Sequence, residues 1–328
     1  MYKSYFNLSR NPFDLTPDPT CFVPTTRHNE ALAALYYGVR RHKGVVVVTG
    51  EVGTGKTLLL RCLLRLFKES EEIAYAYLFN CRLSPTEFLY YTLSDFGVPI
   101  SGNTKSKMLL DLSKFVMARG LKGLTTVLIV DEAHHLSPEL LEEIRLLSNL
   151  ETNEDKLLQI VLVGQPELDQ KLDSFDLRPF KQRIALRAHL GPLDLDEARR
   201  YIEERLRIAG VDTNAAPLFS KQTIASVHQH SRGFPRLINT ICENALISAY
   251  ARQQSTVTPA IIGEVAKELR LDVVFSPQPG KLNGHEDLDA ERAKGILLEL
   301  YAALQKPSAN RGLDGTLAVE ASEHESDI

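Results

Sequence analysis

The chain has 328 residues, of which 44% are hydrophobic and 24% are charged, a balance that indicates a folded globular protein. Its net charge of −4 gives no overall attraction to nucleic acid or to anionic membranes. The longest apolar runs fall far below the ~18 residues of a membrane-spanning helix. The four cysteines lie far apart, which argues against a disulfide framework or a zinc site and favours a cytoplasmic protein with reduced thiols.

Four segments follow one another along the chain. Residues 1–27, rich in proline and aromatic side chains, are expected to form an ordered lead-in that is neither helix nor strand. Residues 28–192 alternate short β-branched runs with helical patterns, which predicts an α/β domain whose parallel sheet is flanked by helices. Residues 193–270 show helical patterns throughout and predict a smaller all-helical domain. Residues 271–328 are expected to form a linker, one short helix near Leu288 to Gln305, and an acidic tail.

Five segments of the α/β domain have the composition of strands. Three of them are almost purely apolar, as expected for strands covered on both faces. They are Val45–Thr49, Ile73–Phe79, Thr126–Val130, Leu158–Val163 and Ile184–His189. The sequence therefore predicts a five-stranded parallel sheet.

The first of these strands runs directly into a phosphate-binding motif. The sequence Gly50-Glu-Val-Gly-Thr-Gly-Lys-Thr matches G-x-x-x-x-G-K-[ST] at each required position, and a helical pattern follows it. Its glycines let the backbone fold around an anion, so that successive N–H groups point at the β-phosphate. The following helix adds the positive end of its dipole. The residues expected to contact the nucleotide here are Gly50, Glu51, Val52, Gly53, Thr54, Gly55, Lys56, Thr57 and Leu58.

Four side chains carry the expected chemistry. Lys56 should reach the β- and γ-phosphates, and Thr57 should place its hydroxyl on Mg²⁺. Asp131 and Glu132 end an apolar strand, which delivers them to the carboxyl edge of the sheet, where ligands of open α/β sheets bind. Asp131 should hold Mg²⁺, directly or through water, and Glu132 should orient the attacking water. The pattern predicts hydrolysis of ATP with Mg²⁺ as cofactor.

Other interpretations of these motifs fit less well. Asp131-Glu-Ala-His134 spells the DEAH motif of one helicase group, but the rest of the chain shows no second RecA-like domain with an arginine-rich motif. A small kinase is disfavoured because Glu132 suits activation of water rather than of a substrate hydroxyl. The adjacent His134 and His135 cannot both face one metal from a single strand or helix face, which disfavours zinc.

Six segments carry a more specific likeness. They read Asn11-Pro-Phe-Asp-Leu-Thr-Pro-Asp-Pro, Thr49-Gly-Glu-Val-Gly-Thr-Gly-Lys-Thr, Asp131-Glu-Ala-His-His-Leu-Ser-Pro-Glu, Arg145-Leu-Leu-Ser-Asn-Leu-Glu-Thr, Gln159-Ile-Val-Leu-Val-Gly-Gln-Pro-Glu-Leu and Gly233-Phe-Pro-Arg-Leu-Ile-Asn. Together they resemble the AAA+ ATPases of the ExeA/GspA type, which are named for secretion protein A of the general secretion pathway. The likeness covers roughly residues 1–270, and the pattern is more distantly similar to the ATPase regulators of bacterial transposition.

This resemblance implies a P-loop AAA+ domain followed by a helical lid, and it implies roles for further residues. Gln165, after the fourth strand, matches the sensor 1 group that contacts the γ-phosphate or the attacking water. Arg236 matches the sensor 2 arginine of the lid, whose guanidinium can bind phosphate oxygens. Asn80, after the second strand, either holds the catalytic Glu132 away until a partner binds or caps a turn. Residues 27–30 lie where AAA+ proteins place the adenine pocket.

The resemblance also implies an arginine finger donated to the ATP of a neighbouring subunit. Arg183, just before the fifth strand, is the first candidate, and Arg178 is the competing one. Such a finger can be worth ~10³–10⁵ in rate. We therefore expect slow hydrolysis by the monomer and faster hydrolysis by a nucleotide-dependent homo-oligomer.

Two biological roles remain open at this point. The first is an assembly factor for a secretion or envelope export system, with components of that system as partners. Members of the group often continue into a transmembrane segment and a peptidoglycan-binding domain, and neither is expected in this chain. The second is an ATP-dependent DNA-binding regulator of the transposition type, which the acidic charge disfavours because DNA-coating proteins usually show a basic stripe. A nucleotide-gated scaffold with negligible turnover is a third class.

Overall fold

A computed structural model describes residues 2–152, 155–211 and 216–271. Its centre is a five-stranded sheet with the strand order β2-β3-β4-β1-β5, in which every neighbouring pair is parallel. The strands are β1 (Val45–Gly50), β2 (Ile73–Leu78), β3 (Thr125–Val130), β4 (Leu158–Gly164) and β5 (Ile184–Leu190). The predicted sheet is confirmed, and no predicted strand end differs from the observed one by more than one residue.

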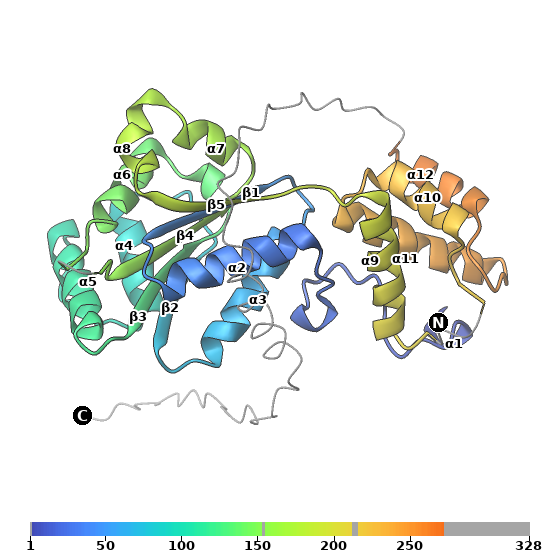
Figure 1. Cartoon of the computed structure of the whole chain (residues 1–328), viewed down its shortest axis with the longest axis horizontal. Coiled ribbons are helices and arrows are strands. Elements are labelled where there is room, and N and C mark those ends of the chain that lie inside the picture. Colours follow the sequence, from blue (N-terminus) through green and yellow to red (C-terminus); the bar gives the residue numbers. More distant parts are fainter. Residues whose placement is uncertain (1, 153–154, 212–215, 272–328) are drawn as a thin grey trace, which may run out of the picture.

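Helices cover both faces of this sheet (Figure 1). One face is covered by α2 (Thr26–Arg40) and α3 (Lys56–Lys68), and the other by α4 (Pro85–Asp95), α5 (Lys105–Gly120) and α6 (Pro138–Leu147). The even-numbered valines of β1 pack on the first layer and the odd-numbered ones on the second, because side chains alternate along a strand. Burial on both faces explains the run of four valines in β1.

The carboxyl edge of the sheet gathers the ends of three neighbouring strands. Val48 of β1 pairs with Val163 of β4, and Leu162 of β4 pairs with Val130 of β3. The loops that leave β1, β3 and β4 therefore start side by side. The short helices α7 (Glu167–Leu172) and α8 (Arg178–Lys181), with a 3-10 turn η3 (Phe175–Leu177) between them, connect β4 to β5.

Four further helices form a separate layer beside the sheet (Figure 1). They are α9 (Leu195–Ile208), α10 (Lys221–Ser231), α11 (Pro235–Ala251) and α12 (Pro259–Glu268), and they pack around a hydrophobic core of their own. This arrangement agrees with the helical lid that the resemblance implies. The predicted helix near residues 288–305 and the acidic tail lie outside the described residues.

The N-terminal segment belongs to this second core. Tyr2, Phe6, Phe13 and Val23 are buried among the side chains of α9–α12. The expectation that residues 1–27 contain no helix is wrong, because the segment holds the short helix α1 (Tyr2–Tyr5) and the 3-10 turn η1 (Pro19–Cys21), and α2 begins at Thr26. So short a helix is unstable alone, and here it is stabilised by packing against α11. Tertiary contacts of this kind leave no local sequence pattern.

Candidate ATPase site

The loop between β1 and α3 has the geometry of a phosphate-binding loop. Gly53 and Gly55 have φ angles of 85° and 98°, in the left-handed region that glycine adopts without strain. Gly55 is the N-cap of α3, and no side chain caps this helix end. The N–H groups of the first turn are therefore available to an anion. The Thr54 hydroxyl donates to the carbonyl of Glu51 at 2.8 Å and tightens the loop.

Lys56 is the first residue of α3, and its side chain lies within the loop. Its Nζ donates to the carbonyl oxygens of Gly50 at 2.7 Å and Glu51 at 3.0 Å. Burial lowers the pKa of Lys56, and the carboxylates of Glu132 and Asp131 oppose that shift. The ammonium is thus placed at the mouth of the anion site, where a phosphate would offer a stronger acceptor than the two carbonyls.

Asp131 follows β3 and is fixed by three neighbours. The side chain is buried, its Oδ2 accepts from the Tyr77 hydroxyl at 2.9 Å, and its Oδ1 accepts from the Glu132 backbone N–H at 2.9 Å. The thiol of Cys81 donates to the Asp131 carbonyl at 3.0 Å. Burial raises the pKa of Asp131, while the hydrogen bonds from Tyr77 and from the Glu132 N–H lower it. Sequence reasoning missed Tyr77, because only the placement of β2 beside β3 brings its hydroxyl to Asp131.

Glu132 and Gln165 lie on two sides of the His134 ring. Glu132 has a φ of 52°, which is unusual for a residue other than glycine and marks a locally strained position. Its Oε2 lies 3.3 Å from His134 Nδ1, and the Gln165 Nε2 lies 3.0 Å from His134 Nε2. The structure therefore brings Glu132 and Gln165 together at the carboxyl edge and adds His134, which the sequence did not single out for this role.

Arg236 lies at the start of α11, directly against the phosphate loop. Its backbone N–H donates to the carbonyl of Gly53 at 3.2 Å, and a Cβ on Gly53 would come within 2.9 Å of the Arg236 Cβ. No side chain caps the N-terminus of α11. The lid thus contacts the loop through the helix end that carries the sensor 2 candidate, and the Arg236 side chain itself is exposed.

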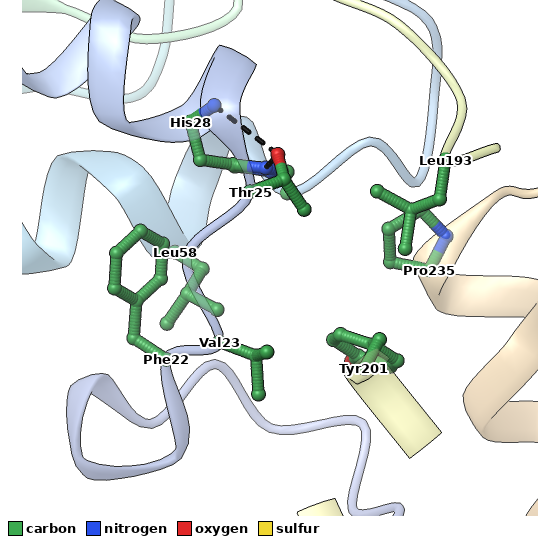
Figure 2. A pocket seen from close by; sticks show the side chains of 9 residues that line it. Phe22, Val23, Thr25, His28, Leu58, Leu193, Tyr201 and Pro235 are labelled. Carbon is green, nitrogen blue, oxygen red and sulfur yellow. Dashed lines mark hydrogen bonds between the residues drawn. The ribbon is translucent and has the colours of Figure 1, made fainter. Parts of the chain in front are cut away.

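A small pocket adjoins the phosphate loop between the N-terminal segment and the lid. In Figure 2, Phe22, Val23 and Leu58 lie opposite Leu193, Tyr201 and Pro235. The remaining lining residues are Thr25, His28 and Gly55. Of residues 27–30, where the adenine pocket is expected, His28 lines this pocket.

His28 links this pocket to the phosphate loop. The Thr25 hydroxyl lies 2.7 Å from His28 Nδ1, and His28 Nε2 lies 2.9 Å from the carbonyl of Thr54. Burial lowers the pKa of His28 and keeps the ring neutral. A neutral ring satisfies both partners by donating from Nε2 to the carbonyl and accepting from the hydroxyl at Nδ1.

The two arginine-finger candidates lie away from this site. Arg183 precedes Ile184, which pairs with Val45 at the amino end of β1. The six residues of β1 separate that edge from the phosphate loop by roughly 20 Å. The Arg183 guanidinium lies 4.0 Å from Glu151, and the Arg178 guanidinium lies 4.7 Å from the centre of the Phe175 ring. Arg183 therefore cannot reach the phosphate loop of its own chain.

Asn80 has the local role of a turn cap. Its Oδ1 accepts from the backbone N–H of Arg82 at 3.1 Å, and the side chain is exposed. Among the described residues, no hydrogen bond joins Asn80 to Glu132. The structure therefore favours the turn-capping interpretation.

The residues present fit a Mg²⁺ ion bound together with a nucleotide. Asp131 supplies a buried carboxylate held in place by Tyr77, and Thr57 lies one residue after Lys56 at the start of α3. Mg²⁺ is typically held by one or two protein oxygens together with phosphates and water. Within the described ranges there is no cluster of three or more His, Cys, Asp or Glu side chains that could hold a metal by itself.

Fold and site together define a P-loop ATPase of the AAA+ class. A family model described as an AAA domain matches residues 39–172. General secretion pathway protein A of Aeromonas hydrophila is 43% identical over 270 residues, which are 82% of this chain and 48% of that protein. The chain is thus an AAA+ ATPase of the ExeA/GspA type, and it spans about half the length of this relative.

Solved structures share the fold at low sequence identity. Cdc6p from Pyrobaculum aerophilum superposes with a TM-score of 0.60 at 20% identity, over 81% of this chain and 72% of that one. The Aeropyrum pernix ORC1 protein in complex with DNA gives a TM-score of 0.59 at 17% identity, over 90% and 87% of the two chains. In the part of the chain described here, no helix is both long and apolar enough to cross a bilayer.

Proposed function

We propose that the chain hydrolyses ATP in a Mg²⁺-dependent reaction and that hydrolysis moves the lid relative to the sheet within a homo-oligomer. One observation supports this above all. Neighbouring strand ends bring Lys56, the pair Asp131–Glu132 and Gln165 to one edge, and the lid adds Arg236 at Gly53 beside the pocket. The groups proposed to bind phosphate, hold a metal and orient water thus gather at one edge of the sheet.

Each side chain then has a defined task. Lys56 exchanges the carbonyls of the loop for the β- and γ-phosphates, and the uncapped start of α3 directs N–H groups at the same anion. Glu132 orients the attacking water, Gln165 contacts that water or the γ-phosphate, and Arg236 binds the phosphate from the lid. Bound Mg²⁺, held by Thr57 and Asp131, would neutralise charge on the phosphate oxygens.

The position of Arg183 supports a site completed by a second subunit. It lies at the amino edge of the sheet, roughly 20 Å from its own phosphate loop, so it can act only on the nucleotide of a neighbouring chain. Arg183 is partly exposed, and its guanidinium lies 4.0 Å from the exposed carboxylate of Glu151, a weak ion pair that a phosphate could displace. We therefore retain Arg183 as the trans arginine and Arg178 as its competitor.

The proposed biological role is assembly of a secretion or envelope export system. The relative named general secretion pathway protein A supports it, and components of such a system are the proposed partners. The need for ATP and the four free, buried thiols support a cytoplasmic location. DNA-dependent regulation is the alternative. Retention on duplex DNA that requires ATP and falls steeply with salt would support that alternative against the export role.

Turnover measured against protein concentration tests the catalytic proposal. Wild-type protein should release phosphate only with Mg²⁺, and its specific activity should rise with concentration. Lys56→Ala should lose ATP binding, whereas Glu132→Gln should bind ATP and trap that state. The proposal is wrong if the folded wild-type protein binds ATP but releases no phosphate at any concentration.

Mixing two inactive variants tests the trans arginine. Glu132→Gln retains a functional arginine but has a dead site, and Arg183→Ala retains a functional site but has lost the arginine. A mixture should recover part of the turnover that each lacks alone. Recovery with Arg178→Ala in place of Arg183→Ala would transfer the role to Arg178. An Arg183→Ala variant with wild-type activity would exclude Arg183.

A further inference from the structure

His134 connects the two residues proposed to handle the attacking water. Its ring is buried between Glu132 and Gln165, with Nδ1 at 3.3 Å from Glu132 Oε2 and Nε2 at 3.0 Å from the Gln165 Nε2. Glu132 is part of the loop after β3, and Gln165 follows β4. The ring therefore bridges two strand ends.

The backbone around His134 is fixed, so the ring cannot easily leave this position. Residues Ala133–His135 form a 3-10 turn, η2, and Lys171 of α7 donates to the carbonyls of His134 and Leu136. A Cβ on Gly164 would lie 3.1 Å from the His134 backbone nitrogen, so the turn approaches the end of β4 closely. These contacts fix the backbone position from which the ring extends.

The proton on the ring follows from its partners. Burial lowers the pKa of His134, which favours a neutral ring with a single N–H. Nε2 lies 3.0 Å from the Gln165 side-chain amide nitrogen, and if Nε2 accepts from that amide, the N–H is on Nδ1. Glu132 Oε2 and the Gln165 backbone nitrogen lie 3.3 Å and 3.4 Å from Nδ1, and the carboxylate oxygen is the acceptor of the two.

The Glu132 carboxylate lies against this ring. Its Oε2 is buried and forms no hydrogen bond with the described residues, and His134 Nδ1 lies within ion-pair distance of it at 3.3 Å. The inward-facing oxygen of the carboxylate is therefore next to the ring, whereas the side chain as a whole is 43% exposed. A left-handed φ of 52° at Glu132 makes this placement a strained one that needs such support.

We propose that His134 is a positioning residue that ties the orientation of the Glu132 carboxylate to the side chain of Gln165. When Gln165 turns toward the γ-phosphate or the attacking water, its contact with the ring changes and the ring transmits that change to Glu132. His134 itself touches neither substrate nor metal. This inference rests on the proposed hydrolysis, because it assigns a function to a contact beside the same site.

Steady-state kinetics of three variants test this positioning role, with wild type and Glu132→Gln as references. His134→Ala should lower kcat by about 10–100-fold, because small misplacements of a catalytic group are costly, with KM and the Kd for ATP nearly unchanged. His134→Asn keeps a donor near the Nδ1 position and should recover part of kcat. His135→Ala removes an exposed ring whose centre lies 4.0 Å from that of His134, and it should lower kcat much less than His134→Ala does.

Combining these variants with Gln165→Ala separates positioning from a merely structural role. Gln165→Ala should cost less in the His134→Ala background than in wild type, because the two act through one connection. Independent, multiplicative losses would overturn the proposal, as would an unchanged kcat or a loss confined to KM. If His134→Ala does not fold, His134→Asn with and without Gln165→Ala decides by the same comparison. Absence of wild-type turnover would instead refute the proposed hydrolysis.

Discussion

Arg205 of α9 joins the N-terminal segment to the lid, and its replacement measures how much this connection contributes to stability. The side chain is only 4% exposed, although its helix is rich in charged residues. Its guanidinium donates to three backbone carbonyls of the N-terminal segment, those of Pro12 at 2.6 Å, Asp14 at 3.0 Å and Cys21 at 3.3 Å. No carboxylate takes part in these three bonds, so the charge is satisfied here by peptide oxygens.

The expected loss of stability follows from these three hydrogen bonds. A hydrogen bond from a charged donor contributes about 1.5–3 kcal/mol, so three of them set an upper range of about 4.5–9 kcal/mol. Arg205→Met keeps most of the apolar stem and its packing. The bond to Asp14 is only partly buried, so water can replace it. We therefore expect a loss of about 3–5 kcal/mol in the free energy of unfolding, in the range of other broken buried charge sites.

We would compare the free energy of unfolding, measured with denaturant, of wild type, Arg205→Met and a surface control. Arg207→Met removes an exposed arginine of the same helix that pairs with Glu204, and it should change stability by less than about 1 kcal/mol. Arg205→Met should also weaken ATP binding, because Phe22 and Val23 of the pocket directly follow the anchored Cys21. If Arg205→Met matched the control in both stability and Kd for ATP, the segment would not depend on this anchor.

Three further predictions follow from the site. Gly53→Ala should cost about 1–3 kcal/mol in stability and weaken ATP binding by calorimetry, because φ is 85° and the added methyl meets the lid. Gly97→Ala is the control, because its φ of 68° imposes the same backbone strain but its added methyl meets no neighbouring atom. Equal ATP affinity of the two variants would show that the contact between Gly53 and the lid does not affect binding. Tyr77→Phe removes a hydrogen bond to Asp131 and should raise the Mg²⁺ concentration for half-maximal turnover about 10–100-fold, and an unchanged Mg²⁺ titration would refute this. The pKa of His28 is lowered in the folded protein, so the unfolded chain binds the proton first as pH falls. The free energy of unfolding should therefore decrease as pH drops below about 6.5. In the same unfolding assay, His28→Gln should lose less stability over that pH interval than wild type does.

The sheet and the phosphate loop could be predicted from sequence because their signals are local. A parallel strand buried on both faces needs consecutive apolar residues, as in the valines of β1. A loop that wraps an anion needs glycine where φ is positive, as at Gly53 and Gly55. The carboxylates Asp131 and Glu132 were found because they end such a strand. Each of these features is specified by a few adjacent residues.

The supporting residues escaped prediction because their roles depend on contacts far apart in sequence. Tyr77 reaches Asp131 across 54 positions, and Arg205 reaches Pro12 across 193. In sequence, Arg205 resembles the exposed arginines on either side of it. The sequence marks His134 only as the end of a DEAH motif and as a poor zinc ligand, because nothing local shows that Gln165 lies beside its ring. Asn80 is the opposite case: the family resemblance allows it a long-range role beside Glu132, whereas the structure shows a local hydrogen bond that caps a turn.

The walls of the pocket also explain how ATP binding can be coupled to lid position. Val23, Leu193 and Tyr201 belong to the core of the lid and the N-terminal segment, whereas Leu58 packs on the core of the sheet domain. On the proposed function, a base bound between them would contact both bodies, and Arg236 would add a contact to the phosphates from the lid. A ligand shifts a conformational equilibrium only by its difference in affinity for the two states. On the proposed function, ATP would favour the arrangement that brings both walls and Arg236 together, and loss of the γ-phosphate would weaken that preference.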